Sequence, residues 1–128
     1  MISTGPIEDR LMIRELVDSY NDAVMRFDKE AWAANWTDDA TWVLPGTGDG
    51  VTGKENFVPM WEGAMANFGF VGFFASAGPI IVDGDKAHGT WYQQEFLQIL
   101  CKWFLLGKIR IQDQTRCTTD HYHLDYTH

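Results

Sequence analysis

The strongest constraint on the fold of this chain is the turn signal at Asp83-Gly84. An Asp-Gly pair favours the positive φ angles of a two-residue hairpin turn, which joins two antiparallel strands. The residues that follow the turn, from about 86 to 100, predict one long strand. The chain is therefore expected to build an antiparallel sheet around this hairpin.

The first third of the chain predicts two helices. Apolar side chains recur at helical spacing over residues 7–27, so one stripe of this segment is expected to face the core. Asp28 is suited to cap a short second helix, which carries Trp32 and Trp36 one turn apart. A short strand over residues 40–44 and a glycine-rich loop are expected to follow.

A third helix and further strands complete the expected order. The segment Thr52-Gly53-Lys54-Glu55 fits a capping box that opens the helix, and Pro59 predicts a kink or a late start in it. A run over residues 103–111 is expected to turn near Gly107, and residues 119–126 predict a final strand. This order indicates an α+β fold with helices on one face of an antiparallel sheet. No boundary interrupts it, so we expect one domain over residues 1–128.

Charge and composition exclude several classes of partner. The formal net charge is −8 and the ten Lys and Arg residues form no run, which argues against nucleic acid and against an anionic membrane surface. No apolar run is long enough for a membrane helix, and the first residues lack the features of a secretion signal. Cys101 and Cys117 show no metal or redox spacing. A cytoplasmic protein with reduced thiols is expected.

Four segments, in this order, resemble the SnoaL-like branch of the nuclear-transport-factor-2-like (NTF2-like) superfamily. They are Ile13-Arg14-Glu15-Leu16-Val17-Asp18-Ser19-Tyr20, Asp38-Asp39-Ala40-Thr41-Trp42, Gly53-Lys54-Glu55-Asn56-Phe57 and Ile81-Val82-Asp83-Gly84-Asp85-Lys86-Ala87-His88-Gly89-Thr90-Trp91-Tyr92. The resemblance implies a cone in which three N-terminal helices pack on a strongly curved, mostly antiparallel sheet and enclose an apolar pocket. It covers residues 7 to about 97, and the chain departs from the family pattern after Cys101.

The resemblance also implies a small hydrophobic ligand, no cofactor and a homodimer. Dehydratases of this branch use a tyrosine on the first helix, an aspartate shortly after it and a histidine just before the hairpin. Tyr20 matches the tyrosine, but the aspartate position falls on Met25 and the histidine position falls near Phe73 or Phe74. Because a thioether or a phenyl ring cannot accept a proton, the resemblance does not support this dehydratase mechanism.

The long strand supplies another candidate acid or base. Side chains alternate across a strand, so one covered face is expected to carry Ala87, Gly89, Trp91, Gln93, Glu95, Leu97 and Ile99. A carboxyl group in an apolar cavity has a raised pKa, which suits proton transfer near neutral pH, and Glu95 is the candidate for this role. Alternatively, Glu95 pairs with Arg110 or Arg116, or reaches solvent at the strand end.

Aromatic and neighbouring side chains form the predicted ligand pocket. The expected ligand-binding residues are Trp36, Trp42, Trp61, Met65, Phe73, Trp91 and Gln93, although an aromatic stripe is also typical of a core. Tyr20 fits a core position and a ligand contact equally well. The outer face of the long strand, which includes His88, is expected to be solvated or to form a polar dimer interface. His121 and His123 share a strand face, but the sequence identifies no third metal ligand.

Two functional hypotheses follow from these features. The first is an enzyme that acts on a small hydrophobic metabolite by cofactor-free proton transfer, such as isomerisation, dehydration or cyclisation. Glu95 would transfer the proton and Tyr20 would polarise a substrate oxygen. The second is a non-catalytic binding or dimerisation module of the same fold, which the apolar Met25 and Phe73 favour.

Overall fold

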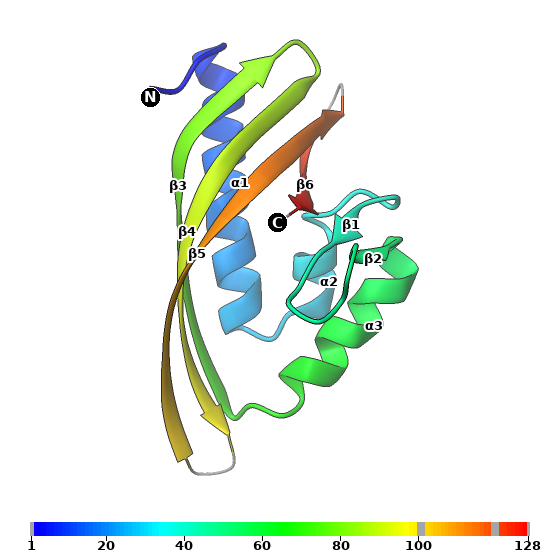
Figure 1. The fold of residues 1–128 in the computed structure, drawn as a ribbon, viewed down its shortest axis with the longest axis vertical. Helices are drawn as coiled ribbons and strands as arrows, with labels where there is room; N and C mark the ends of the chain where they lie inside the picture. The colour runs from blue at the N-terminus through cyan, green and yellow to red at the C-terminus, as the bar shows by residue number, and fades with distance from the viewer. Residues whose placement is uncertain (1, 100–101, 119–120, 128) are drawn as a thin grey trace.

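The computed structural model describes the backbone of residues 2–99, 102–118 and 121–127 and the side chains of residues 2–98. Its elements are α1 (Ile7–Met25), α2 (Lys29–Ala33), β1 (Thr41–Trp42), β2 (Val51–Thr52), α3 (Lys54–Met65), β3 (Phe70–Asp83), β4 (Lys86–Ile99), β5 (Lys102–Thr118) and β6 (His121–Thr127). The long strands bend along their length, and the helices lie on one side of them (Figure 1). This is the α+β architecture that the sequence predicted.

The sheet is an antiparallel meander in the order β3-β4-β5-β6, and β1 pairs separately with β2. Asp83 pairs with Lys86, so the predicted hairpin is present, but its two turn residues are Gly84 and Asp85 and not Asp83 and Gly84. Of these residues, Gly84 alone has a positive φ, at +61°. The predicted turn near Gly107 was wrong, because β5 runs unbroken through it and only its register against β4 shifts there. Glycine marks a bulge within a strand as readily as a turn.

A bulge also interrupts the pairing of β3 with β4. The register shifts between Ala77 and Ile80, where Gly78 and Pro79 lie. The guanidinium group of Arg14 on α1 donates hydrogen bonds to the carbonyl oxygens of Ala77, at 3.2 Å, and Gly78, at 3.5 Å. The helix therefore satisfies carbonyl groups at the point where the strand is irregular.

The N-terminal segment covers the end of the outer edge of β3. Thr4 forms a parallel bridge with Ile81, and its backbone exchanges hydrogen bonds with Ile80, at 2.9 Å, and Val82, at 3.0 Å. Gly5 has a φ of +97°, and a Cβ atom there would lie 2.6 Å from Cβ of Val82, so only glycine fits this approach. The last residues of the β3 edge are thereby closed to a further strand.

Helix α1 buries the predicted apolar stripe. Ile13, Val17, Tyr20, Ala23 and Val24 are its buried residues. The expected stripe ended at Phe27, but this residue lies beyond the helix, has a φ of +55° and is 38% exposed. The carboxylate of Asp28 accepts the backbone N–H of Ala31 at 2.9 Å, which confirms the predicted helix cap. This N–H and the Arg26 guanidinium group lower the pKa of Asp28.

Helix α3 begins differently from the prediction. Its N-cap is Gly53, with a φ of +94° and no side-chain hydrogen bond, so the predicted capping box was wrong. The hydroxyl group of Thr52 instead lies 2.8 Å from that of Thr41, because these residues pair across β1 and β2. Pro59 lies inside the helix, which extends from Lys54 to Met65.

The core is an aromatic cluster centred on Trp32, which has no exposed surface. Its ring lies 5.5 Å from that of Trp36, 5.4 Å from that of Trp42 and 4.6 Å from that of Trp61, with the last pair stacked at 8°. Phe57 joins the same cluster from α3. Of the described helices, none combines the length and apolar character needed to cross a bilayer.

Candidate functional site

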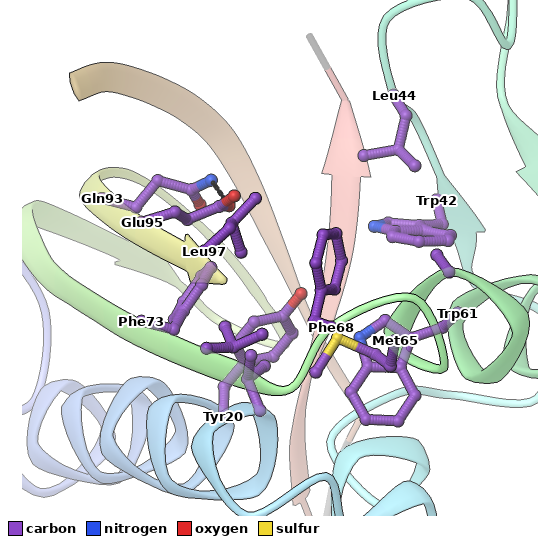
Figure 2. A pocket seen from close by; sticks show the side chains of 13 residues that line it. Tyr20, Trp42, Leu44, Trp61, Met65, Phe68, Phe73, Gln93, Glu95 and Leu97 are labelled. Atoms are coloured by element: carbon purple, nitrogen blue, oxygen red, sulfur yellow. Dashed lines mark hydrogen bonds between the residues drawn. The ribbon is translucent and has the colours of Figure 1, made fainter. Parts of the chain in front are cut away.

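A cavity of about 240 Å³ lies between the helices and the inner face of the sheet (Figure 2). Helices α1 and α3 line one part of it, strands β3 and β4 line another, and β1 with the residues around it completes the wall. The lining residues are Tyr20, Val24, Trp42, Leu44, Trp61, Ala64, Met65, Phe68, Val71, Phe73, Gln93, Glu95 and Leu97. Most of this surface is apolar, which suits a small hydrophobic ligand.

The wall on the helical side is aromatic and well supported. Trp61 lines the cavity and stacks on the fully buried Trp32 at a centroid distance of 4.6 Å. Trp42 lines the cavity beside it and meets Trp32 edge to face at 5.4 Å. Packing of this kind leaves the indole rings little freedom to fill the space in front of them.

The wall on the sheet side carries the polar groups Gln93 and Glu95, which share one face of β4. The amide Nε2 of Gln93 donates a hydrogen bond to Oε1 of Glu95 at 2.8 Å (Figure 2). Phe73 lies opposite Glu95 across the strand pair, and Leu97 follows on the same face. The carboxylate is half-buried, held by an amide and bordered by apolar side chains.

The other end of the Gln93 amide has no hydrogen-bond partner among the described residues. Gln93 is only 6% exposed, and its Oε1 atom is buried. A buried acceptor without a donor costs about 1–3 kcal/mol, so native proteins rarely leave one unsatisfied. This atom is therefore the unusual feature of the cavity wall.

Tyr20 belongs to both the core and the cavity. Its ring contacts those of Trp32, Phe73 and Trp91 at centroid distances of 6.0, 5.4 and 5.8 Å. Figure 2 shows its hydroxyl group directed into the space between the aromatic wall and the Gln93–Glu95 wall. The ring thus packs as a core residue, while the hydroxyl end lies at the cavity wall.

The cavity brings together most of the residues that the sequence selected. Tyr20, Trp42, Trp61, Met65, Phe73, Gln93 and Glu95 all line it. Trp36 and Trp91 do not, because both point into the packed core, where they are 0% and 3% exposed. Trp36 packs on Phe57 at 5.1 Å, and Trp91 packs on Tyr20.

The residue that follows Tyr20 on the cavity side of α1 is Val24, not Met25. Val24 lies one helical turn after Tyr20 and lines the cavity, whereas Met25 ends the helix and is 36% exposed. Phe73 lines the cavity, and Phe74 lies on the outer face of the sheet. Val24 and Phe73 are both apolar, so neither supplies an acid or a base.

Several lining residues were missed by the sequence analysis. They are Val24, Leu44, Ala64, Phe68, Val71 and Leu97. Periodicity could have found five of them. Val24 and Ala64 are each about one helical turn from a predicted site residue, and Leu44, Val71 and Leu97 are each two residues from one on a strand. Phe68 lies beyond the end of α3, where no period applies.

Within the part of the chain whose side chains are described, no group of three or more His, Cys, Asp and Glu residues could hold a metal ion. The side chains of His121 and His123 lie outside the described residues, as do those of Arg110 and Arg116, the predicted alternative partners of Glu95. Among the described residues, Gln93 is one partner of the Glu95 carboxylate.

The model of the SnoaL-like domain family matches residues 6–127. The chain belongs to the SnoaL-like family. This confirms the resemblance seen in the sequence and extends it through the last quarter of the chain. No curated protein sequence matches the chain.

Solved structures share the fold of this SnoaL-like protein. One is a candidate dehydratase of the NTF2-like family from Streptomyces avermitilis, which is 21% identical over 94% of this chain and 93% of its own, with a TM-score of 0.76. A hexachlorocyclohexane dehydrochlorinase is 15% identical over 94% and 81%, with a TM-score of 0.77. A candidate scytalone dehydratase from Novosphingobium aromaticivorans is 14% identical over 95% and 86%, with a TM-score of 0.71. At these identities the likeness establishes an NTF2-like fold.

Enlarging a side chain at the cavity should cost less than enlarging one in the packed core. Val71 lines the cavity, whereas Val17 is equally buried in the core and does not line it. Val71→Phe should change the free energy of unfolding by less than about 1 kcal/mol, because the new ring enters empty space. Val17→Phe should lose about 1–3 kcal/mol through overpacking. Urea unfolding of both variants measures the difference, and equal losses would contradict the cavity.

Proposed function

We propose that this SnoaL-like protein is an enzyme that transfers a proton on a small hydrophobic molecule without a cofactor. Glu95 takes or returns the proton, and the hydroxyl group of Tyr20 polarises an oxygen atom of the substrate. The observation that carries the proposal is a half-buried carboxylate at the wall of an apolar cavity, oriented by the 2.8 Å hydrogen bond from Gln93. A group held in this way is suited to act as a general base or acid.

The names of structural relatives support a reaction of this class. A dehydratase removes water and a dehydrochlorinase removes hydrogen chloride, and both names describe an elimination in which a proton leaves the substrate. Elimination, isomerisation and cyclisation all need a group that moves a proton in a water-poor site. For this chain, Glu95 meets that need without the aspartate and histidine of the dehydratases.

The alternative is a non-catalytic binding module. The apolar side chains of Met25 and Phe73 at the dehydratase positions favour it. An apolar ligand, however, needs no carboxylate or buried amide in its pocket, and both are costly to place there. The presence of Gln93 and Glu95 in the lining therefore supports the enzyme over the binding module.

The proton-transfer role can be tested without knowing the natural substrate. In 5-nitrobenzisoxazole, a base removes the proton on carbon 3, its electron pair forms the nitrile and the N–O bond breaks to release a coloured phenolate. We expect the wild-type protein to accelerate this elimination, and Glu95→Gln to lower the rate about 10²–10⁴-fold, the usual contribution of a general base. The release of phenolate is followed by its visible absorbance.

The matched control is Glu15→Gln, which removes an exposed carboxylate on α1 that is not part of the cavity lining. Its elimination rate should equal that of the wild-type protein. If Glu95→Gln also keeps the wild-type rate, Glu95 has no proton-transfer role and the binding module is the better account.

We also propose that two copies associate through the outer face of the sheet. The sequence of β4 alone predicted a polar outer face. The neighbouring strand β3 adds Phe70 and Phe74 to this face, and they are 46% and 55% exposed. Phe74 packs edge to face on Phe96 of β4 at 6.2 Å, and the exposed ring of Tyr92 lies on the same face. Exposed aromatic groups of this kind are typical of protein interfaces.

A charge placed on this face should separate the two copies. Phe74→Glu should shift the protein from dimer to monomer in sedimentation velocity, because a buried interface tolerates an unpaired charge poorly. Met60→Glu on α3 is the control, since Met60 is exposed but lies away from the sheet face. A wild-type protein that is already a monomer, or a Phe74→Glu dimer, would contradict the proposed interface.

A further inference from the structure

The amide of Gln93 is satisfied on one side only. Its Nε2 atom donates to Glu95 at 2.8 Å, and its Oε1 atom is buried without a donor among the described residues. Only 6% of the surface of Gln93 is exposed, and the residue lines the cavity. A molecule in the cavity is therefore in position to supply the missing donor.

The orientation of this amide follows from its neighbour. An ionised carboxylate only accepts hydrogen bonds, so the amide has to present its NH₂ group to Glu95. The reverse orientation would bring two acceptor oxygen atoms together, and a carboxylate next to a carbonyl oxygen is unfavourable. The Glu95 carboxylate thus forces the Oε1 atom of Gln93 to seek its donor elsewhere.

We propose that the cavity binds a compact aromatic or bicyclic molecule that carries a hydroxyl group, and that this hydroxyl group donates its hydrogen bond to Oε1 of Gln93. Drug-sized ligands occupy about 300–1,000 Å³, so a volume of about 240 Å³ suits a smaller molecule. The aromatic wall of Trp42 and Trp61 would contact its rings.

The proposed contact also places the ligand for reaction. Gln93 and Glu95 are two residues apart on one face of β4, so a hydroxyl group held by Gln93 lies beside the carboxylate. This inference deepens the proposed function and rests on it, because it names the substrate class of the same cavity. Gln93 is a substrate-binding residue in this scheme, and it also positions Glu95.

Two probes of nearly equal shape test the inference: 2-naphthol, which carries a hydroxyl donor, and 2-methylnaphthalene, which carries a methyl group in its place. Equilibrium dialysis measures the dissociation constant of each. The wild-type protein should bind 2-naphthol about tenfold more tightly, the value of one good hydrogen bond to an otherwise unsatisfied buried acceptor. Gln93→Met should bind the two probes about equally, because methionine keeps the length of the side chain and removes the acceptor.

The affinity for 2-methylnaphthalene is the internal control for folding. It should be unchanged in Gln93→Met within about threefold, because the apolar walls remain. Glu95→Gln should weaken the preference for 2-naphthol, since the amide of a glutamine at that position can donate an N–H group to Oε1 of Gln93 and satisfy it.

Each contrary result overturns the inference. A wild-type protein without a preference for 2-naphthol means that water or no group at all satisfies Gln93. A preference that survives in Gln93→Met but disappears in Glu95→Gln means that the carboxylate is the acceptor. Failure of the proposed function is separate, because an unchanged elimination rate in Glu95→Gln would remove the proton-transfer role while leaving the naphthol preference as a measured fact.

Discussion

The cavity depends on how Asn21 holds helix α1 against the sheet. Its side-chain amide donates to the carbonyl oxygen of Ala75 at 2.9 Å and accepts the N–H of the same residue at 3.1 Å. This pair of hydrogen bonds fixes the rotation of the helix about its axis, and Arg14 adds a second attachment at the β3 bulge. Tyr20 directly precedes Asn21 on this helix. As a consequence, Tyr20 and Val24 face the interior and line the cavity.

Two rigid walls keep this cavity from collapsing. On one side, the Trp32 cluster is packed from several elements and supports Trp42 and Trp61. On the other side, the paired strands hold Gln93 and Glu95 at fixed spacing. Closing the gap would require either the aromatic cluster to unpack or the polar pair to enter an apolar core, and both changes are costly. Rigid walls of this kind are what a binding site needs to orient its ligand.

Much of the fold was predictable because its signals are local. The hairpin after β3, the Asp28 cap and the alternation along β4 each depend on a few neighbouring residues, and the structure confirms them, with the hairpin turn one residue later than predicted. The same alternation placed Gln93 and Glu95 on the covered face. Contacts between distant segments were not predictable, and the Asn21–Ala75 pair, for example, joins residues 54 positions apart. The spacing of apolar residues also does not show that Trp61 lines the cavity while Trp36 is buried in the core.

The most direct test of the account is a ¹H–¹⁵N NMR titration of the protein with 2-naphthol, because the tryptophan side chains report different places in one spectrum. We predict that the indole signals of Trp42 and Trp61 shift on binding, since both rings line the cavity, and that the signal of Trp36 moves far less. Shifts confined to the backbone of Phe70, Phe74 and their neighbours on the outer sheet face would contradict the cavity as the ligand site.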